Sequence, residues 1–490
     1  MTNIHIPEIN IHVMGPEVTL LAAALAALLF ALFVREGRGG TVIAVVGVLG
    51  VLVALVLTAL LMSQALPAYA FGQSFVLDTP SAVMDLVILM AALAALLTAP
   101  REMEVSPDFA ALVLWSAVGM MLLVGANDLI VLFLGVEIVS LPLYILAAFR
   151  PERGTSLEAA VKYFLLGAFS SGFLLYGLAF LYGATGSTNL ETIGHAIAQG
   201  GSGLGGVLAA PLLLKIGLAL VIVGLGFKLA LVPFHMWVPD VYEGSPTPVT
   251  TFMSVGTKAA AFGALARVLF VAVPVAGVAW EPVIFVLAIL TILLGALLTL
   301  PQTNMKRLLA YSGILNAGYV AATLTTGAAG LSSALYFLVA YALMNLGAFT
   351  VVTTLSTSRE EGSEMTAYRG LYYRNPWIAV AMSVFLLSLA SIPPTAGFLA
   401  KFYILKTLVA GQDIPLAVAL VVGTAITLYT YARPVISMFQ RQDEEARPAA
   451  RVPVVLAVFL AVLAIGVIGV GVAPGGVLHM IDGGGLAGGL

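Results

Sequence analysis

GFKLALVPFHMWVPD, residues 226–240, is an apolar stretch that carries a lysine at position 228 and a proline at position 233. Proline has no backbone N–H, and its ring clashes with the carbonyl group four residues earlier, which here belongs to Leu229. A helix through this stretch should therefore break at Pro233. The break would leave carbonyl groups free to hold water or protons.

A second stretch, SLASIPPTAGFLAKF at residues 388–402, has the same character. Pro393, Pro394 and Gly397 predict a second break, and Lys401 follows Gly397 by about one turn. Paired interrupted helices are typical of transporter folds built from repeated units, whereas a single proline kink is common in membrane helices. Because the two breaks lie an odd number of predicted spans apart, the two units should have opposite orientations in the membrane.

The composition places the chain in a membrane. Of its 490 residues, 61% are hydrophobic and only 9% are charged, whereas soluble domains carry about 25% charged residues. The chain has no cysteine, which excludes disulfides, thiolate metal sites and iron–sulfur ligation within it. Its formal net charge of −3 gives no reason to expect a nucleic-acid partner. We expect a lipid bilayer around it and no metal or cofactor bound to it.

Hydropathy predicts an all-α polytopic membrane protein with about fourteen transmembrane helices, because each span needs about 20 apolar residues. The two interrupted stretches form part of spans 7 and 12. The predicted spans are residues 17–34, 41–63, 81–99, 109–125, 128–148, 158–184, 210–239, 247–273, 282–300, 306–325, 331–356, 377–410, 416–439 and 453–473.

The loop cations predict the orientation. Lys and Arg occur only in alternate loops, and the loops of opposite parity contain none. The positive-inside rule then places both termini on the outer side and supports an even number of spans. The glycine-rich end of the chain should be disordered or lie on the outer surface. The loop cations are Arg35, Arg38, Arg101, Arg150, Arg153, Lys306, Arg307, Arg359, Arg369, Arg374, Arg441, Arg447 and Arg451.

Four ionisable residues fall near the middle of predicted spans: Glu137, Lys228, Lys258 and Lys401. Ionisable residues at that depth are costly and are candidates for function. All four can carry a proton, so proton or cation movement is the leading hypothesis. A Glu137–Lys228 pair would keep both groups charged until another charge disturbed it. The alternative is that these charges only hold helices together, although apolar packing can replace buried ion pairs.

Two further residues are open to either interpretation. Lys162, near one end of span 6, either takes part in transfer or extends its ammonium group toward water. His235, two turns after Lys228, either relays a proton or caps the carbonyl groups of the broken helix. Aromatic residues near span ends, among them Trp237 and Tyr242, fit an interfacial belt, and we assign them no chemistry. The carboxylates Asp85 and Asp128 also lie near span ends. Four cations toward span ends fit snorkelling side chains: Lys215, Arg267, Lys406 and Arg433.

At these residues the chain resembles the antiporter-like, proton-pumping membrane subunits of respiratory complex I, the NADH–quinone oxidoreductase. The resemblance covers most of the chain and is densest from Asn127 to about Phe439. The N branch of that family fits best, because Lys401 stands where the M branch carries glutamate and because the long lateral helix of the L branch has no room here. The segments that carry the resemblance are NDLIVLFLGVEIVSLPLYIL (127–146), GFKLALVPFHMWVPDVYEGSPTPVTTFMSVGTKAA (226–260), NMKRLLAYSGILNAGY (304–319) and SLASIPPTAGFLAKFYIL (388–405).

The resemblance implies two inverted five-helix repeats, spans 4–8 and 9–13, with broken helices at spans 7 and 12. It implies that Glu137 and Lys228 act as a coupled pair, Lys258 as a central relay and Lys401 as the outlet-side site. Lys162 matches a further channel position of the family. The units are 1–108 with the first three spans, 109–273 with the first repeat, 274–440 with the second, and 441–490 with the last span and the tail.

The leading hypothesis is a proton-translocating, non-redox subunit of NADH–quinone oxidoreductase in a bacterial cytoplasmic (inner) membrane. The resemblance implies that its partners are other membrane-arm subunits, and that NADH, FMN, iron–sulfur clusters and quinone are handled by partner chains. The alternatives are an Mrp-type cation/proton antiporter subunit, a hydrogenase-linked homologue, or a structural or quinone-site scaffold. The proteins that co-purify with the chain in mild detergent would separate these hypotheses.

Overall fold

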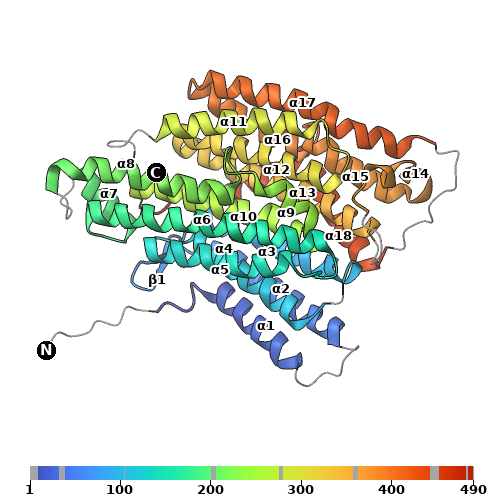
Figure 1. Cartoon of the computed structure of the whole chain (residues 1–490), viewed down its shortest axis with the longest axis horizontal. Coiled ribbons are helices and arrows are strands. Elements are labelled where there is room, and N and C mark those ends of the chain that lie inside the picture. Colours follow the sequence, from blue (N-terminus) through green and yellow to red (C-terminus); the bar gives the residue numbers. More distant parts are fainter. Residues whose placement is uncertain are drawn as a thin grey trace.

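The computed structural model describes residues 9–31, 39–103, 105–199, 206–274, 280–356, 362–441, 452–481 and 484–488. In these residues the chain is almost wholly helical, as the composition predicts (Figure 1). The elements are α1 (Gly15–Ala31), α2 (Gly39–Met62), β1 (Ala68–Ala70), β2 (Phe75–Leu77), α3 (Thr79–Thr98), η1 (Ala99–Arg101), α4 (Pro107–Val124), α5 (Leu129–Ala147), α6 (Gly154–Thr185), α7 (Leu190–Ala198), α8 (Gly206–Leu229), α9 (Trp237–Gly244), α10 (Thr247–Arg267), η2 (Val268–Ala272), α11 (Glu281–Thr299), α12 (Met305–Ala322), η3 (Thr323–Thr326), α13 (Gly327–Leu355), η4 (Met365–Tyr368), α14 (Leu371–Arg374), α15 (Pro376–Leu389), α16 (Ala396–Ala410), α17 (Ile414–Phe439), α18 (Val454–Val472) and α19 (Gly475–Ile481).

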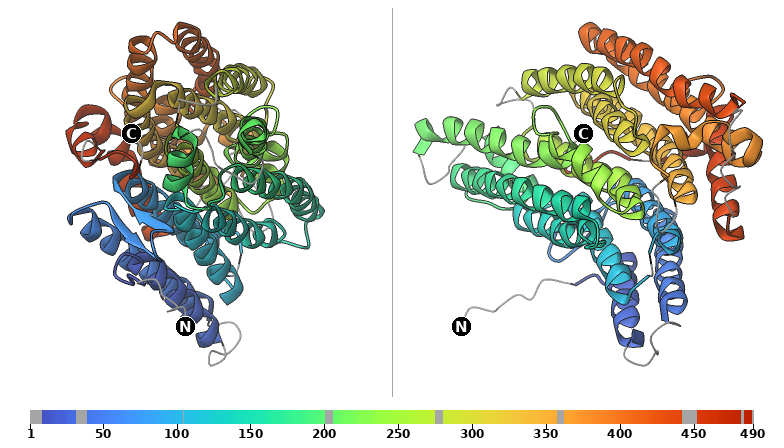
Figure 2. Two further views of the ribbon diagram at one scale, coloured as in Figure 1. Left: turned by 90° about the vertical axis from the view of Figure 1, so that its left-hand side faces the viewer. Right: turned by 45° about the vertical axis from the view of Figure 1, so that its right-hand side comes forward.

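The helices form a bundle in which α1 and α17 lie at opposite edges (Figures 1 and 2). Eleven helical segments of the described residues are long and apolar enough to cross a membrane, and one of them joins α12 to α13. The chain is therefore an all-α integral membrane protein. Helix α10 lies at the centre, where all its residues are buried against neighbours that include α3, α4 and α13. By contrast, α6 exposes large apolar side chains such as Phe169, as a lipid-facing helix would.

Both predicted helix breaks are present, because α8 ends at Leu229 and α15 ends at Leu389. The breaks share one hydrogen-bond pattern. Ala230 and Ser391 have φ angles of 70° and 65°, and each is followed by a residue whose N–H donates five residues back. These bonds run from Leu231 N to Gly226 O over 2.8 Å and from Ile392 N to Leu387 O over 3.0 Å. The proline clash therefore ends two separate helices in the same way.

Gly397 has a close-packing role at the second break. A Cβ atom there would lie 2.0 Å from the carbonyl oxygen of Ser388, so no larger residue fits without a shift. The Gly397 N–H donates to the Ser388 hydroxyl over 3.0 Å. The glycine lets the start of α16 rest directly on the end of α15.

Two small elements occur where we expected only loops. An antiparallel hairpin, β1–β2, pairs Tyr69 with Val76 between α2 and α3, and helix α7 lies between α6 and α8. The hairpin packs against Val13 and Met14, which precede α1, and against Ala82 of α3. It thus covers the end of the bundle at which α1 and α3 begin.

The end of the chain lies at the same end of the bundle. The N–H of Ala487 donates to Asp78 Oδ2, next to the start of α3, over 3.0 Å, and Leu486 is buried. Residues 484–488 therefore pack against the helix bundle. Residues 482–483 and 489–490 are outside the described residues.

Candidate functional site

Lys228 lies at the end of α8, where Pro233 ends the helix, and is only 3% exposed. Its Nζ atom has no hydrogen-bond partner among the described residues. It lies 5.4 Å and 5.2 Å from the ring centroids of Tyr144 and Tyr163. The π-faces of these rings attract a cation and can partly replace water around the ammonium group. The buried lysine therefore lies in an aromatic cage.

Glu137 interacts with Lys228 through its charge and not through a direct contact. It lies two turns before Tyr144 on α5, so both side chains occupy one helix face. Its Oε1 atom has no hydrogen-bond partner within the described part of the chain, and its charge acts on Lys228. The predicted pair is therefore brought within electrostatic range, but it makes no direct ion pair.

The placement of Trp237 and Tyr242 in an interfacial belt was wrong. Both residues are 1% exposed and lie inside the bundle. Trp237 stacks on the cage residue Tyr163, with 4.5 Å between ring centroids, and its indole N–H donates to the Phe227 carbonyl across the break over 3.0 Å. In the sequence, Trp237 and Tyr242 follow the end of an apolar run and so look like residues at a span end. The run ends there because the helix is interrupted inside the bundle.

Lys258 is tied to the helix that follows the first break. It is 3% exposed on α10, and its Nζ donates to the Tyr242 hydroxyl over 3.1 Å. A Cβ atom on Gly313 would lie 3.1 Å from Lys258 Nζ and 3.2 Å from the Tyr341 hydroxyl. Both groups therefore border the space beside Gly313.

A small closed cavity adjoins Lys258. Its volume is about 10 Å³, room for about one water molecule, and the residues around it include Lys258, Asn316 and Tyr341. Asn316 continues the polar contacts, because its Nδ2 donates to the Ser312 hydroxyl over 3.3 Å. The Ser312 hydroxyl in turn makes a short hydrogen bond with the Tyr431 hydroxyl of α17.

Lys401 lies at the second break and is 5% exposed. Its Nζ donates to the carbonyl oxygen of Leu389 over 2.9 Å, a group that the end of α15 leaves free. The same Nζ lies 5.1 Å from the ring centroid of Tyr319 on α12. Lys401 thus follows its break, whereas Lys228 precedes the first one.

A polar stripe on α12 lies between the two lysine sites. Ser312, Asn316 and Tyr319 occur at positions i, i+4 and i+7, which places them on one helix face. The stripe contacts the Lys258 cavity at Asn316 and Lys401 at Tyr319. This stripe is not among the residues predicted from the sequence, although its spacing within YSGILNAGY indicates a shared helix face.

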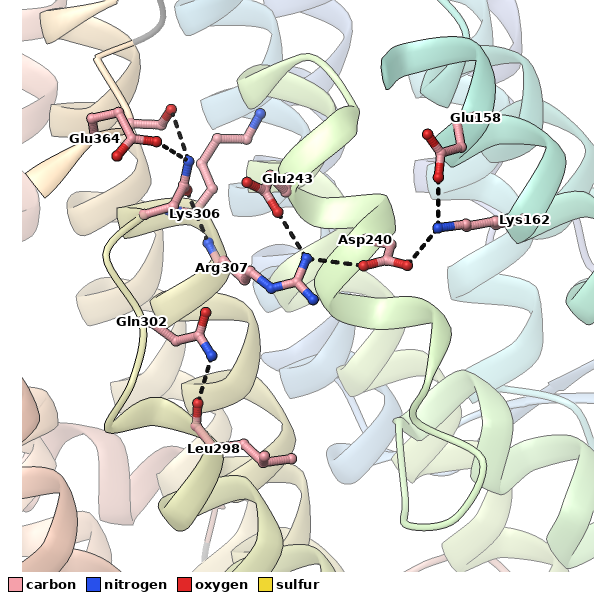
Figure 3. Close-up of polar contacts among 11 residues, drawn as sticks. Glu158, Lys162, Asp240, Glu243, Leu298, Gln302, Lys306, Arg307 and Glu364 are labelled. Atoms are coloured by element: carbon pink, nitrogen blue, oxygen red, sulfur yellow. Dashed lines mark hydrogen bonds and ion pairs between the residues drawn. The ribbon is translucent and has the colours of Figure 1, made fainter. Parts of the chain in front are cut away.

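A half-exposed network joins α6, α9 and α12 (Figure 3). Asp240 of α9 accepts hydrogen bonds from Lys162 Nζ over 2.7 Å and from Arg307 Nη1 over 2.9 Å. Lys162 also pairs with Glu158 over 2.7 Å, and Arg307 pairs with Glu243 over 2.8 Å. These residues line an open cavity of about 620 Å³. Lys162 is therefore an ion-paired residue at a water-accessible end of the bundle.

Asp240 is the hub of this network. Its partial burial opposes ionisation, but hydrogen bonds and charge from Lys162 and Arg307 outweigh that effect. The pKa of the Asp240 carboxyl is therefore lower than its ordinary value. The carboxylate remains charged at neutral pH and holds α6 and α12 to the segment that follows the first break.

The structure also describes His235 and Arg267. His235 is half-buried in the first break loop, and its Nδ1 atom has no hydrogen-bond partner among the described residues. Arg267, which we expected to extend toward water, is fully buried and pairs with Asp78 over 2.8 Å. That expectation was wrong, because the hairpin and the tail cover this end of α10.

The arrangement is suited to moving a monovalent cation through protonatable groups. Lys228, Lys258 and Lys401 are buried, and hydroxyl and amide side chains of α12, which donate and accept hydrogen bonds, lie between two of them, Lys258 and Lys401. No group of three or more His, Cys, Asp or Glu side chains in the described residues could hold a metal ion. Fold and site together define an integral membrane protein of the ion-translocating class.

The comparison with known proteins identifies the family. Residues 126–427 match the profile described as "NADH:quinone oxidoreductase/Mrp antiporter, TM", and the chain belongs to this family. The NADH-quinone oxidoreductase subunit N 1 of Symbiobacterium thermophilum is 41% identical over 489 residues, which cover 97% of this chain and 98% of the relative.

Solved structures share the fold. A chain of respiratory complex I from Thermus thermophilus is 36% identical, with a TM-score of 0.82 over 96% of this chain and 100% of that chain. A chain of the Mrp complex from Dietzia has a TM-score of 0.79 over 95% of each chain. At 20% identity, the Mrp chain shows similarity of fold alone.

Proposed function

We propose that this chain is a proton-translocating subunit of NADH–quinone oxidoreductase, and that its protons move through Glu137, Lys228, Lys258 and Lys401. The observation that carries the proposal is the set of three buried lysines among these residues, none more than 5% exposed, of which Lys258 and Lys401 both adjoin the polar stripe of α12. Ionisable residues buried to this degree in a membrane bundle are costly to retain unless they act. The chain itself performs no redox step.

The proposed path begins at the Asp240 network. Its cavity opens to solvent, and Lys162 lies on its lining, so protons would enter there and reach the Lys228 cage. Glu137 would then control how firmly Lys228 holds its proton, since its charge acts on that lysine. Lys258 and the α12 stripe would pass the proton to Lys401 as the outlet. His235, beside the first break, would act as an auxiliary relay.

The proposed topology has fourteen spans and two inverted five-helix repeats. Within the described ranges, eleven segments are long enough to cross, and one of them contains both α12 and α13, while α1 and the interrupted α15–α16 add shorter ones. The matching hydrogen bonds at the two breaks support repeats at 109–273 and 274–440, flanked by units 1–108 and 441–490. Residues before α1 and residues after α19 meet at one end of the bundle, which agrees with an even number of spans.

The proposed setting is a bacterial cytoplasmic membrane, with both termini on the outer side and other membrane-arm subunits as partners. The name of the Symbiobacterium relative and the complex I structure support this assembly. NADH, FMN, iron–sulfur clusters and quinone would be bound by the partner subunits.

Replacement of Lys228 tests the function. We expect Lys228→Ala to abolish donor-driven proton uptake by inverted membrane vesicles while the complex still assembles. Lys215→Ala is the matched control, because Lys215 lies on the same helix with an exposed side chain. Near-normal proton uptake by the Lys228 variant would show that Lys228 is not part of the proton path.

An Mrp-type cation/proton antiporter is the second candidate, because the family profile and the shared fold include such proteins. Purification of the chain in mild detergent separates the two. Flavin and iron–sulfur proteins in the same particle support the oxidoreductase. A particle that lacks these proteins and, in vesicles, exchanges sodium for protons supports the antiporter.

A further inference from the structure

A further buried lysine lies outside the proposed proton path. Lys306 was counted among the loop cations, but it is fully buried at the start of α12. Its Nζ atom donates to the carbonyl oxygen of Ser245 over 2.7 Å. Ser245 ends α9, and α10 begins two residues later at Thr247. The structure therefore directs this cation onto residues 245–247, the junction of α9 and α10.

A buried carboxylate meets the same junction. Glu102, the residue after η1, is 3% exposed, and its Oε2 atom accepts from the N–H of Thr247 over 3.0 Å. A helix leaves carbonyl groups free at its end and N–H groups free at its start. The helix dipole favours a cation at the first position and an anion at the second. Lys306 and Glu102 therefore match the two halves of the junction in both hydrogen bonding and charge.

Helix α9 depends on contacts of this kind because it has only eight residues, and helices this short are marginal without tertiary packing. Its start is held by the bond from the Trp237 indole to the Phe227 carbonyl. Its end lies directly on α6, because a Cβ atom on Gly244 would lie 2.5 Å from the carbonyl oxygen of Thr155. The bond from the α12 lysine adds a buried, charged hydrogen bond at that end.

The position of this junction sets the position of Tyr242. Tyr242 lies three residues before Ser245, within one helical turn, and its hydroxyl accepts from Lys258 Nζ over 3.1 Å. Its carbonyl oxygen accepts from the Thr250 hydroxyl in the first turn of α10 over 2.9 Å. A shift of the junction would therefore move the ring that contacts Lys258. Arg307 follows the buried lysine on α12, points in a different direction from it and binds α9 on its half-exposed side (Figure 3).

We propose that Lys306 is a positioning residue for proton transfer. By holding the Ser245 carbonyl, it keeps the Tyr242 hydroxyl within hydrogen-bond reach of Lys258. Glu102 supports the same junction from the side of α10. Neither residue has to release a proton in this role. The inference rests on the proposed function, because it concerns the same path through Lys258.

Lys306→Met tests this role in the full-length chain within its native complex. Methionine keeps a long, apolar side chain, but it cannot donate to the carbonyl group. We expect donor-driven proton uptake by inverted vesicles, per assembled complex, to fall about tenfold or more, the factor that corresponds to a lost hydrogen bond with a charged group. Lys215→Met is the matched control, because its side chain is exposed. Near-parental uptake by Lys306→Met would overturn the proposal.

A double variant separates positioning from a general loss of stability. If Lys306 acts through Tyr242, Lys306→Met should cause no further loss of uptake per assembled complex in a Tyr242→Phe background. Residues that act independently would multiply their effects, to about a hundredfold loss in the double variant. A multiplied loss would therefore show that Lys306 does not act through Tyr242, and it would overturn the proposal.

Hydrogen–deuterium exchange with mass spectrometry gives a readout that does not depend on proton movement. Lys306→Met should speed amide exchange in α9 about tenfold and leave α16 unchanged, and unchanged exchange in α9 would overturn the proposal. If Lys306→Met does not assemble, Glu102→Gln tests the junction from its other side and should give the same exchange pattern, with the exposed Asp108→Asn as control. Unchanged exchange in the Glu102 variant would overturn the proposal as well. Normal uptake by Lys228→Ala would instead refute the proposed function, whatever the exchange result.

Discussion

Tyr242→Phe isolates one hydrogen bond of the proposed path. The substitution removes the hydroxyl that accepts from Lys258 Nζ over 3.1 Å and retains the ring, whose centroid lies 5.2 Å from the same atom. Both residues are at most 3% exposed, so bulk water does not replace the lost partner. We therefore expect the packing to persist while the lysine loses its positioning contact.

The magnitude follows from burial. Leaving a buried charged group without its hydrogen bond costs about 1.5–3 kcal/mol, which corresponds to about a 10- to 150-fold change in the population of the positioned lysine. If transfer passes through that lysine, donor-driven proton uptake per assembled complex should fall at least about tenfold.

The assay is proton uptake by inverted vesicles, normalised to the amount of assembled complex. Tyr176→Phe is the matched control, because Tyr176 is 60% exposed on α6 and undergoes the same chemical change. Proton uptake by Tyr242→Phe within twofold of the parent would refute the role of this contact.

Three further substitutions test other parts of the site. Glu137→Gln should impair proton uptake more than Glu137→Asp, because only the amide removes the charge that acts on the lysine cage; equal uptake would mean that Glu137 only packs. Lys401→Glu should support more uptake than Lys401→Ala, because a protonated carboxyl group can donate to the Leu389 carbonyl, whereas alanine leaves that buried acceptor unpaired at about 1–3 kcal/mol; full uptake by the alanine variant with failed assembly of the glutamate variant would make Lys401 structural. Asp240→Asn should lower thermal stability at neutral pH by about 1 kcal/mol or less per lost half-exposed pair. Because the folded-state pKa of Asp240 is depressed, its contribution is present above the ordinary aspartate pKa of about 3.9 and is lost as pH falls through the folded-state value. A stability difference that disappears already between pH 7 and pH 5 would contradict this assignment.

The sequence by itself determined the membrane class, the two helix breaks and the buried lysines. Each of these depends on local chemistry. The apolar runs require a bilayer, Pro233 and Pro393 cannot continue a helix, and a lysine in the middle of an apolar run has no nearby span end to reach. These features hold whichever helices become neighbours.

Tertiary structure decided which side chains surround the lysines. Tyr144 and Tyr163 form the Lys228 cage only because α5, α6 and α8 pack together, and Tyr242 reaches Lys258 only because α9 turns into the bundle. Periodicity shows that residues share a helix face, but it does not show which partner that face meets.

Burial at the helix ends also depended on distant parts of the chain. Residues near the C-terminus cover Asp78, which pairs with the buried Arg267, although hydropathy places Arg267 close to the membrane surface. Whether a charge near a span end reaches water is decided by what packs over it. That is a contact between segments far apart in the sequence, which no local pattern records.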